Sequence, residues 1–388
     1  RSTKLVHGGV RYLQQGNISL VMEALKERGL LRQNAPHIVH DQKFVVPNYA
    51  WWEAPFYGVG MKVYDVLAGR YGFGRSRVLS SEEVVERIAT IETDGLRGGV
   101  EYHDGQFDDA RLLVHLARTA VEQGAVVLNH ARVTGLRETD GFVTSVEAVD
   151  AESGETIEAT ARCVVNATGP FADAVRQLED PSVAPLIQPS QGVHVVLDRA
   201  FLPGDAAIMV PRTEDKRVLF AIPWHDRVLI GTTDTMIDQA VLEPRPQEDE
   251  IEFLLRTAAQ YLTRDPTRED VLSVFVGIRP LVRAAEGTET AELSRDHTIH
   301  VSRGGLLTIV GGKWTTYRRM AKDVVDHVTT LADLDPRACP TEDLRIHGYR
   351  EDVGGLGHLA VHGRDADAIL ALAASEPALG AKLHPDLP

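Results

Sequence analysis

The sequence has little cysteine, fewer basic than acidic residues and no long apolar run. Its only cysteines are Cys163 and Cys339, so no disulfide framework is expected, and the apolar neighbours of Cys163 indicate a buried, reduced thiol. The 41 Lys and Arg residues against 56 Asp and Glu residues leave a net charge of −15, which argues against a general nucleic-acid-binding surface. No uncharged apolar stretch approaches about 18 residues and the first residues lack a signal core, so neither a membrane span nor a secreted precursor is expected.

What is present is the composition of a globular protein. Hydrophobic residues make up 43% of the 388 residues and charged residues 25%, which is enough for a sizeable core in two or three domains. The chain has no initiator Met and runs almost at once into Gly8-Gly9. We therefore expect a fragment that is short at its N-terminus and also at its C-terminus.

The first half predicts part of a doubly wound dinucleotide domain. Helices are expected over about 19–32 and, after the capping acids Asp108 and Asp109, up to Gln123. A strand over 125–128 and a three-stranded meander follow, with hairpin turns at Asp140-Gly141 and Ser153-Gly154. An apolar strand then turns through Gly169 into a helix. This order is typical of the later half of such a domain with an inserted β-meander.

The second half predicts an antiparallel domain followed by a return to the first. Short strands are expected over 192–197, 207–210, 218–223, 228–232, 271–278, 298–302 and 306–310. Helices are expected over about 247–262, from the Gly311-Gly312 segment to about 329, and over 366–374. The fold class is therefore mixed α/β (α+β).

The segment from Tyr49 to Leu67 is rich in aromatic and apolar residues but is interrupted by Glu53, Lys62 and Asp65. These charges exclude a membrane span and leave either a core helix or an interfacial helix. The core alternative is the more frequent one for such a segment, and we favour it.

Three glycine-marked segments could carry chemistry. In the first, His7 and Arg11 flank Gly8-Gly9, so a proton acceptor and an anion-binding cation stand beside a backbone open to close approach. The second, Ala167-Thr168-Gly169, ends a buried strand in small residues that permit contact with a cofactor. The third, 311–316, opens a helix with Lys313 and two threonines. A tight turn with a capping His, a strand–helix turn and a helix cap are the respective structural alternatives.

Other candidates end or interrupt strands. Arg279 ends an apolar strand, where a cation needs a polar pocket or a buried salt bridge. Thr233 follows another strand in what is more simply a turn, and His194 lies within a strand, where a core role is the simpler interpretation. No Cys/His cluster indicates a metal, and no Gly-x-Ser-x-Gly indicates a hydrolase.

Taken in order, the motifs resemble the flavin-dependent glycerol-3-phosphate dehydrogenase family, within the glutathione-reductase-like and amino-acid-oxidase-like flavoproteins. The segments that carry the resemblance are 2–13, 35–37, 108–112, 165–170, 222–224, 231–234, 277–281, 294–296 and 311–318. The resemblance covers about 1–328, and the remainder looks like the beginning of the family's C-terminal helical domain. The family's N-terminal βαβ unit with Gly-x-Gly-x-x-Gly is not in this sequence.

The resemblance implies a division of the chain and a set of roles. Residues 1–45, 95–178 and 303–330 would form the FAD-binding domain, 46–94 and 179–302 the substrate-binding cap, and 331–388 a partial helical domain. Expected catalytic residues are His7, Arg11, Arg279 and Lys313, with His7 as the candidate base and His194 second. Expected substrate-binding residues are Tyr12, His194, Thr233, Arg279 and Lys313. Expected FAD-binding residues are Ser2, Thr3, Lys4, Val133, Ala167, Thr168, Gly169, Gly312 and Thr315.

The activity implied is oxidation of sn-glycerol 3-phosphate to dihydroxyacetone phosphate, with hydride transfer to FAD and electrons passing to quinone, in glycerol and glycerophospholipid metabolism. The implied location is cytoplasmic, peripheral on the inner face of the cell membrane; a homodimer stays open, and no nucleic acid or metal is expected. Three alternatives stay open as well: an oxidase that passes electrons to oxygen, an amine or amino-acid oxidase of the same fold, and an inactive remnant without flavin. The resemblance disfavours an NAD-dependent enzyme, but the residues alone do not exclude one.

Overall fold

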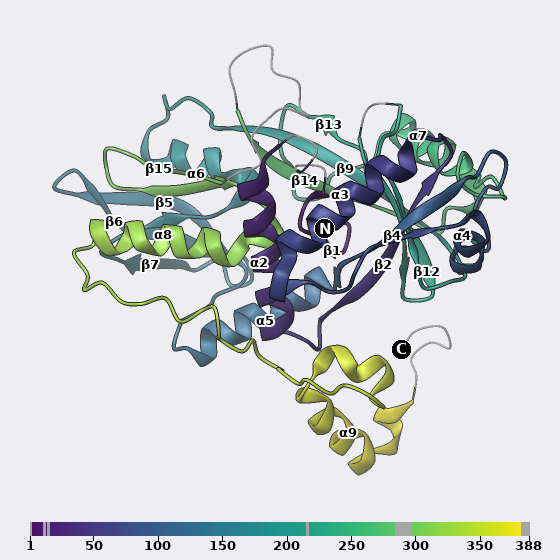
Figure 1. Cartoon of the computed structure of the whole chain (residues 1–388). Coiled ribbons are helices and arrows are strands. Elements are labelled where there is room, and N and C mark those ends of the chain that lie inside the picture. The colour runs from purple at the N-terminus through teal and green to yellow at the C-terminus, as the bar shows by residue number, and fades with distance from the viewer. Residues whose placement is uncertain (1, 11–12, 14–15, 215–216, 284–296, 382–388) are drawn as a thin grey trace.

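The computed structural model describes residues 2–10, 13, 16–214, 217–283 and 297–381 (Figure 1). Its described part is a mixed α/β structure with one large sheet and two three-stranded sheets, which confirms the predicted fold class. Arg11 and Tyr12, both predicted at the site, lie outside the described residues. The motif at 294–296 also lies outside them.

The large sheet has ten strands in the order β1-β4-β2-β10-β11-β12-β9-β13, with β14 paired to β9 and β3 to β4. Its strands are β1 (Leu5–Val6), β2 (Val39–Asn48), β3 (Arg77–Leu79), β4 (Gly98–Phe107), β9 (Ile187–Asp198), β10 (Ala207–Val210), β11 (Leu219–Trp224), β12 (Arg227–Gly231), β13 (Thr235–Met236) and β14 (Ser273–Val282). All described pairings are antiparallel except that of β10 with β2.

The sheet extends across the predicted boundary between the two main parts of the chain. Strands β2 and β4 pair over ten residues from Val39↔Phe107 to Asn48↔Gly98. On its other edge, β2 pairs in parallel with β10. Most of β2 and of β4 fell in the part predicted to bind FAD, and neither was predicted to be a strand. Glycines and acidic residues in β4 weaken its strand propensity, and its pairing with β1, β2 and β3 stabilises it.

Helices cover both faces of this sheet. Along β2, Val45 belongs to a core under α4 (Ser81–Arg87) and α7 (Glu248–Ala259), whereas Phe44 and Val46 belong to a core under α2 (Ile18–Asn34) and α3 (Glu53–Ala68). Alternate side chains of a strand point to opposite faces, so a strand covered on both faces is buried almost continuously.

The smaller sheets form the part around the predicted dinucleotide corner. The meander comprises β5 (Ala131–Thr139), β6 (Phe142–Asp150) and β7 (Thr156–Thr160), as predicted. The second small sheet has the order β15 (His297–Val301), β16 (Leu307–Gly311) and β8 (Val165–Asn166), with β16 and β8 parallel. Around them lie α5 (Asp109–Glu122), α6 (Ala172–Glu179) and α8 (Tyr317–Leu331). Asp108 caps α5 through the Arg111 amide, as expected.

The strand predicted over 125–128 is wrong for the described structure. These residues form no strand, and the side chains of Val126, Val127 and Leu128 are exposed. A strand needs a partner for its backbone groups, and no described strand lies beside this segment.

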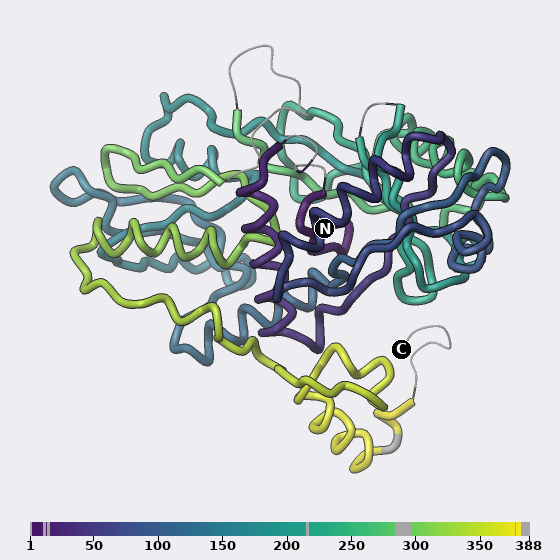
Figure 2. Tube along the Cα trace, in the orientation of Figure 1, coloured from purple at the N-terminus to yellow at the C-terminus, as the bar shows by residue number. Residues whose placement is uncertain are grey.

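The end of the chain forms a small helical unit joined by an extended segment (Figure 2). It contains α9 (Asp365–Ser375) between the short helices η6 (Gly357–His362) and η7 (Pro377–Gly380). His347 attaches it to α5 by contacting Glu122, and the His347 carbonyl accepts from buried His115. The remaining short helices are η1 (Gly69–Tyr71), η2 (Gly169–Phe171), η3 (Arg199–Phe201), η4 (Arg268–Asp270) and η5 (Trp314–Thr316).

Candidate active site

A cavity of about 200 Å³ lies where the segment after β1 meets the large sheet. Its lining comes from that segment, from β2, β4, β10 and β11, from the turn after β12 and from β14. The lining residues are Thr3, Leu5, His7, Gly9, Val10, Phe44, Tyr102, Asp104, Met209, Arg217, Val218, Phe220, Thr232, Thr233, Asp234 and Arg279. Segments far apart in sequence therefore converge on one small, partly polar chamber.

The cavity brings together four of the predicted site residues: Thr3, His7, Thr233 and Arg279. His194 and Lys313 are not part of its lining. His194 nevertheless contacts the cavity wall, because its Nε2 lies 2.9 Å from Thr3 Oγ1. Lys313 lies in the loop that contacts His7, two residues before Thr315, and its Nζ is buried.

Arg279 is held in place by groups from two segments, the turn after β12 and strand β9. Its Nη1 donates to Asp234 Oδ1 at 3.2 Å and to the Gln191 carbonyl at 3.4 Å. Its Nη2 donates to Thr232 Oγ1 and to the Thr233 carbonyl, both at 3.1 Å. The side chain keeps 28% of its surface exposed, so a fixed guanidinium is presented at the cavity. Such an arrangement suits a phosphate or an oxyanion.

Thr233 reaches the cavity, but its hydroxyl already serves the fold. It donates to Glu250 Oε1 at 2.9 Å and accepts from the Val193 amide at 2.9 Å. The side chain is buried. Thr233 contributes to the site through its carbonyl, which accepts a hydrogen bond from Arg279 and helps to hold that guanidinium.

His194 is a buried, neutral imidazole. It stacks on Phe275 with ring centroids 4.8 Å apart. Burial, together with the charges of Arg279 and Lys4, lowers the pKa of His194 to about 3. Its Nδ1 is buried and has no hydrogen-bond partner among the described residues. The structure thus places this residue beneath the cavity wall rather than within the cavity.

The residues before β1 form a second polar group beside His194. Lys4 pairs with Asp109 at the start of α5, and Ser2 Oγ donates to the same carboxylate at 2.7 Å. Burial opposes ionisation of Asp109, but the contacts from Lys4 and Ser2 lower its pKa overall. The backbone of Lys4 has a φ of +62°, a conformation uncommon for a side-chain-bearing residue.

The glycine loop after β16 contacts the segment of His7 directly. The His7 amide donates to Thr315 Oγ1 at 3.3 Å. Gly312 has a φ of +75°, a backbone conformation that favours glycine, and a Cβ there would overlap the thioether of Met320. The third and first glycine-marked segments of the sequence are therefore neighbours in space.

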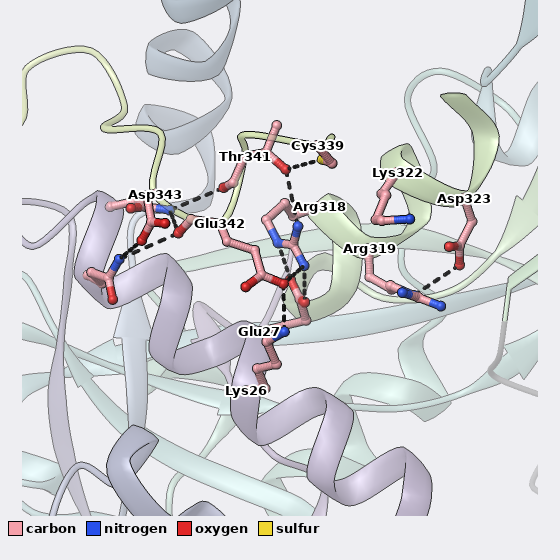
Figure 3. A network of polar contacts seen from close by, with 12 residues as sticks. Lys26, Glu27, Arg318, Arg319, Lys322, Asp323, Cys339, Thr341, Glu342 and Asp343 are labelled. Carbon is pink, nitrogen blue, oxygen red and sulfur yellow. Dashed lines mark hydrogen bonds and ion pairs between the residues drawn. The ribbon is translucent and has the colours of Figure 1, made fainter. Parts of the chain in front are cut away.

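A buried ion pair locks this loop to α2 (Figure 3). Arg318 follows η5, and its Nε donates to Glu27 Oε2 at 2.8 Å while Nη2 donates to Oε1 at 2.5 Å. Its Nη1 also donates to Thr341 Oγ1 at 3.1 Å, and Lys26 pairs with Glu342 at 2.6 Å. Helix α2 and the chain beyond α8 are thus joined through one guanidinium.

The corner after β8 is a fixed turn with exposed residues. Asn166 Nδ2 donates to the Ala172 carbonyl at 2.9 Å, and its Oδ1 accepts from Thr168 Oγ at 2.7 Å, which fixes the turn. Ala167 and Thr168 are exposed, Gly169 has a φ of +58°, and open space lies where a Gly169 side chain would be. Backbone groups at this corner are therefore accessible to a cofactor. Val133, also expected near FAD, lies half-buried in β5.

Much of the cavity wall was not predicted from the sequence. Phe44 and Tyr102 face each other across β2 and β4, and Met209 comes from β10. Arg217 at the entrance to β11 adds a guanidinium that no motif had indicated. The apolar run of β2 was a usable signal, but its pairing with β4 was not readable locally. Among the described residues, no cluster of three or more His, Cys, Asp or Glu side chains is placed to hold a metal ion.

The chain is similar in sequence to known glycerol-3-phosphate dehydrogenases. The mitochondrial glycerol-3-phosphate dehydrogenase of Mus musculus is 40% identical over 366 residues, covering 90% of this chain and 50% of that protein. That of Arabidopsis thaliana is 42% identical over 362 residues, covering 90% of this chain and 57% of that protein. The chain therefore spans about half the length of the curated relatives it matches.

Solved structures show the same fold. The glycerol-3-phosphate dehydrogenase from Bacillus halodurans complexed with FAD has a TM-score of 0.76 and 28% identity, covering 97% of this chain and 70% of that chain. The L-α-glycerophosphate oxidase from Mycoplasma pneumoniae with FAD bound has a TM-score of 0.63 and 14% identity, a likeness of fold alone. The model of the family described as FAD dependent oxidoreductase matches residues 1–318, so the chain belongs to the FAD-dependent oxidoreductases, whose cofactor is FAD.

Proposed function

We propose that this chain carries the substrate site of an FAD-dependent glycerol-3-phosphate dehydrogenase, which oxidises sn-glycerol 3-phosphate to dihydroxyacetone phosphate. The observation that carries the proposal is the convergence of His7 and the fixed guanidinium of Arg279 on one cavity of about 200 Å³. The similarity to glycerol-3-phosphate dehydrogenases at about 40% identity supports the choice of substrate.

The oxidation removes a hydride from carbon 2 and a proton from its hydroxyl. When bound, FAD supplies the hydride acceptor, held by the segment 2–4, the corner 167–169 and the glycine loop with Gly312 and Thr315. The imidazole of His7 takes the hydroxyl proton. Arg279 orients the anionic substrate, and its hydrogen bonds to Asp234 and Thr232 hold the guanidinium in a fixed position during the reaction. The aromatic wall of Phe44, Tyr102 and Phe220 limits water in the cavity.

We further propose that electrons pass to quinone at a membrane surface, with the enzyme peripheral on the inner face of the cell membrane. The support is the outer face of α3. Phe56, Val59, Val63 and Val66 follow one another at helical spacing and are all exposed, with Trp51 and Trp52 just before the helix. The opposite face of α3, with Met61 and Tyr64, packs into the core. The helix therefore has one core face and one exposed apolar face.

The exposed stripe suits adsorption at a lipid surface. Trp51 and Val66 are 77% and 80% exposed, and together with their neighbours they form an apolar surface with aromatic side chains at one end. No helix within the described residues is long and apolar enough to cross a membrane. The net charge of −15 opposes adsorption to anionic lipid, so apolar insertion must supply the binding free energy.

The substrate is tested by the visible spectrum of the full-length protein before and after anaerobic glycerol 3-phosphate. We expect a flavin band that bleaches. Arg279→Lys should raise the substrate concentration for half-maximal bleaching by about tenfold or more, because a lysine cannot reproduce the forked contact. Arg256→Lys, at an exposed pair with Glu214, is the matched control and should behave as the parent.

Each other outcome has a meaning. A flavin band that persists would refute glycerol 3-phosphate as substrate, and a colourless, cooperatively folded protein would support the remnant without flavin. Once the band bleaches, reoxidation by a short-chain quinone with little oxygen uptake supports the dehydrogenase. Rapid stoichiometric oxygen uptake without quinone would instead make the protein an oxidase.

Membrane attachment is tested by sedimentation with phosphatidylcholine vesicles. We expect the full-length protein to sediment, and the double variant Val59→Ser/Val66→Ser to sediment at least about fivefold less, since each loses exposed apolar surface. Leu242→Ser/Leu272→Ser removes two exposed apolar side chains outside α3 and serves as the control. Equal loss in both double variants would remove α3 as the contact surface.

A further inference from the structure

The segment that carries His7 is anchored through its backbone. The Gly8 amide donates to the hydroxyl of Tyr64 at 2.9 Å, and the His7 amide donates to Thr315 Oγ1 at 3.3 Å. Tyr64 lies on the inner face of α3, and a Cβ at Gly8 would overlap both its hydroxyl and Leu25. The position of Gly8, and with it the neighbouring His7, is therefore set by where the Tyr64 hydroxyl lies.

The Tyr64 hydroxyl is in turn fixed by a buried ion pair. It donates to Asp104 Oδ2 at 2.9 Å, and Asp104 Oδ1 accepts from Arg28 Nη1 at 2.6 Å. Arg28 Nη1 also lies 3.3 Å from the Tyr64 oxygen. Burial, reinforced by the Asp104 charge, raises the pKa of Tyr64 well above its ordinary value, so the phenol keeps the proton that it donates. The single proton is committed to Asp104, and the oxygen is left to accept from Gly8.

The arrangement is costly if its only purpose is stability. The side chains of Arg28 and Asp104 are 1% and 3% exposed, and well-packed apolar residues commonly replace such a pair without loss of stability. The three residues come from α2, α3 and β4, and Asp104 also lines the cavity that His7 and Arg279 line. The ion pair thus lies at the place where three elements meet the candidate base.

We propose that Tyr64, Asp104 and Arg28 form a positioning triad that fixes the Gly8 amide and thereby holds the His7 imidazole at the substrate hydroxyl. The inference rests on the proposed function, in which His7 takes the substrate proton. The three are positioning residues, because they act through the backbone of the His7 segment. Displacement of a catalytic group by about 1 Å can cost as much as about a hundredfold in rate, so a small shift at Gly8 has a large effect.

The test measures anaerobic flavin bleaching in the full-length holoenzyme by stopped flow. Tyr64→Phe keeps the ring and removes the hydroxyl that holds Gly8. We expect the limiting bleaching rate per bound flavin to fall about tenfold, while the substrate Kd from the same traces stays within about twofold, because Arg279 is held independently. Tyr49→Phe is the matched control: its hydroxyl donates to the Glu92 carbonyl at 2.8 Å, and its rate should equal the parent's.

A second variant separates positioning from stability. Arg28→Met/Asp104→Leu removes both buried charges, so the melting temperature should fall less than when either residue is replaced alone. Because Tyr64 loses its acceptor, the rate per flavin should fall about as far as in Tyr64→Phe. This double variant decides the matter if Tyr64→Phe does not fold. A limiting rate per flavin within about twofold of the parent in the folded variant would overturn the triad, even if the melting temperature fell. If the parent protein itself does not bleach, the proposed function fails, and the role of the triad fails with it. Failure of the triad alone is seen only in the variants, as an unchanged rate in a parent that bleaches.

Discussion

The buried pair of Glu27 and Arg318 provides a quantitative test of how α2 and α8 are joined. The carboxylate and guanidinium side chains are 3% and 9% exposed and make two hydrogen bonds with one another. Glu27→Leu leaves the guanidinium with the Thr341 hydroxyl at 3.1 Å and the more exposed Glu342 at 3.7 Å. Breaking a buried pair from one side costs about 3–5 kcal/mol, and these two residual contacts place the expected loss near the lower end, at about 3 kcal/mol.

The assay is urea unfolding monitored by tryptophan fluorescence. Trp314 lies in η5, four residues before Arg318, and its ring centroid is 5.9 Å from that of Phe107. The double variant Glu27→Leu/Arg318→Leu should return to within about 1 kcal/mol of the parent, because no charge is left buried without its partner. Lys322→Ala breaks a more exposed pair with Asp326 on the same helix and should cost about 0.5 kcal/mol or less. If the single substitution costs less than about 1 kcal/mol, or the double variant costs as much as the single one, the reasoning is refuted.

Two further predictions concern protonation and backbone conformation. Burial, with His115 beside it, lowers the pKa of His37 to about 4. As the pH falls from about 6.5 to 4, the unfolded chain therefore binds a proton that the folded protein does not bind, and the urea concentration at the unfolding midpoint should fall. His37→Gln should make this midpoint less dependent on pH. Gly312→Ala, at a φ of +75° against Met320, should lower the unfolding free energy by about 1–2 kcal/mol and reduce the flavin-to-protein ratio, whereas Gly60→Ala, with open space around it in α3, should do neither.

The sequence predicted those helix ends and turns that depend on residues next to one another in the chain. Asp108 caps α5 and Asp140-Gly141 forms the hairpin turn between β5 and β6 with φ values of +52° and +81°, because both depend on neighbours within a few residues. Strands β2 and β4 were missed because their pairing joins residues that lie far apart in the sequence, from Val39↔Phe107 to Asn48↔Gly98. The segment 125–128 was overpredicted for the converse reason, since its apolar residues have strand propensity but no described partner strand.

The site was predictable to the extent that it depends on motifs. His7 and Arg279 were identified from glycine and strand-end patterns together with the family resemblance, and the structure brings both to one cavity. Ordinary core residues such as Phe44 and Met209 also line the cavity, and nothing in their local sequence distinguishes them from other core positions. The hydroxyl of Thr233 illustrates the reverse case, because a residue in a matching motif proves to be bound to Glu250.

The charges around the cavity explain how a chain with a net charge of −15 can receive a phosphate dianion. Each carboxylate of the wall has a guanidinium at hydrogen-bond distance: Asp104 has Arg28 at 2.6 Å, and Asp234 has Arg279 at 3.2 Å. Arg217 also lines the cavity, and Lys313 lies in the loop that contacts His7, so basic side chains from several elements gather where the substrate phosphate is proposed to bind. Because close and partly buried charges are screened less by salt than exposed ones, these local cations act on a bound phosphate more strongly than the net charge of the whole chain does.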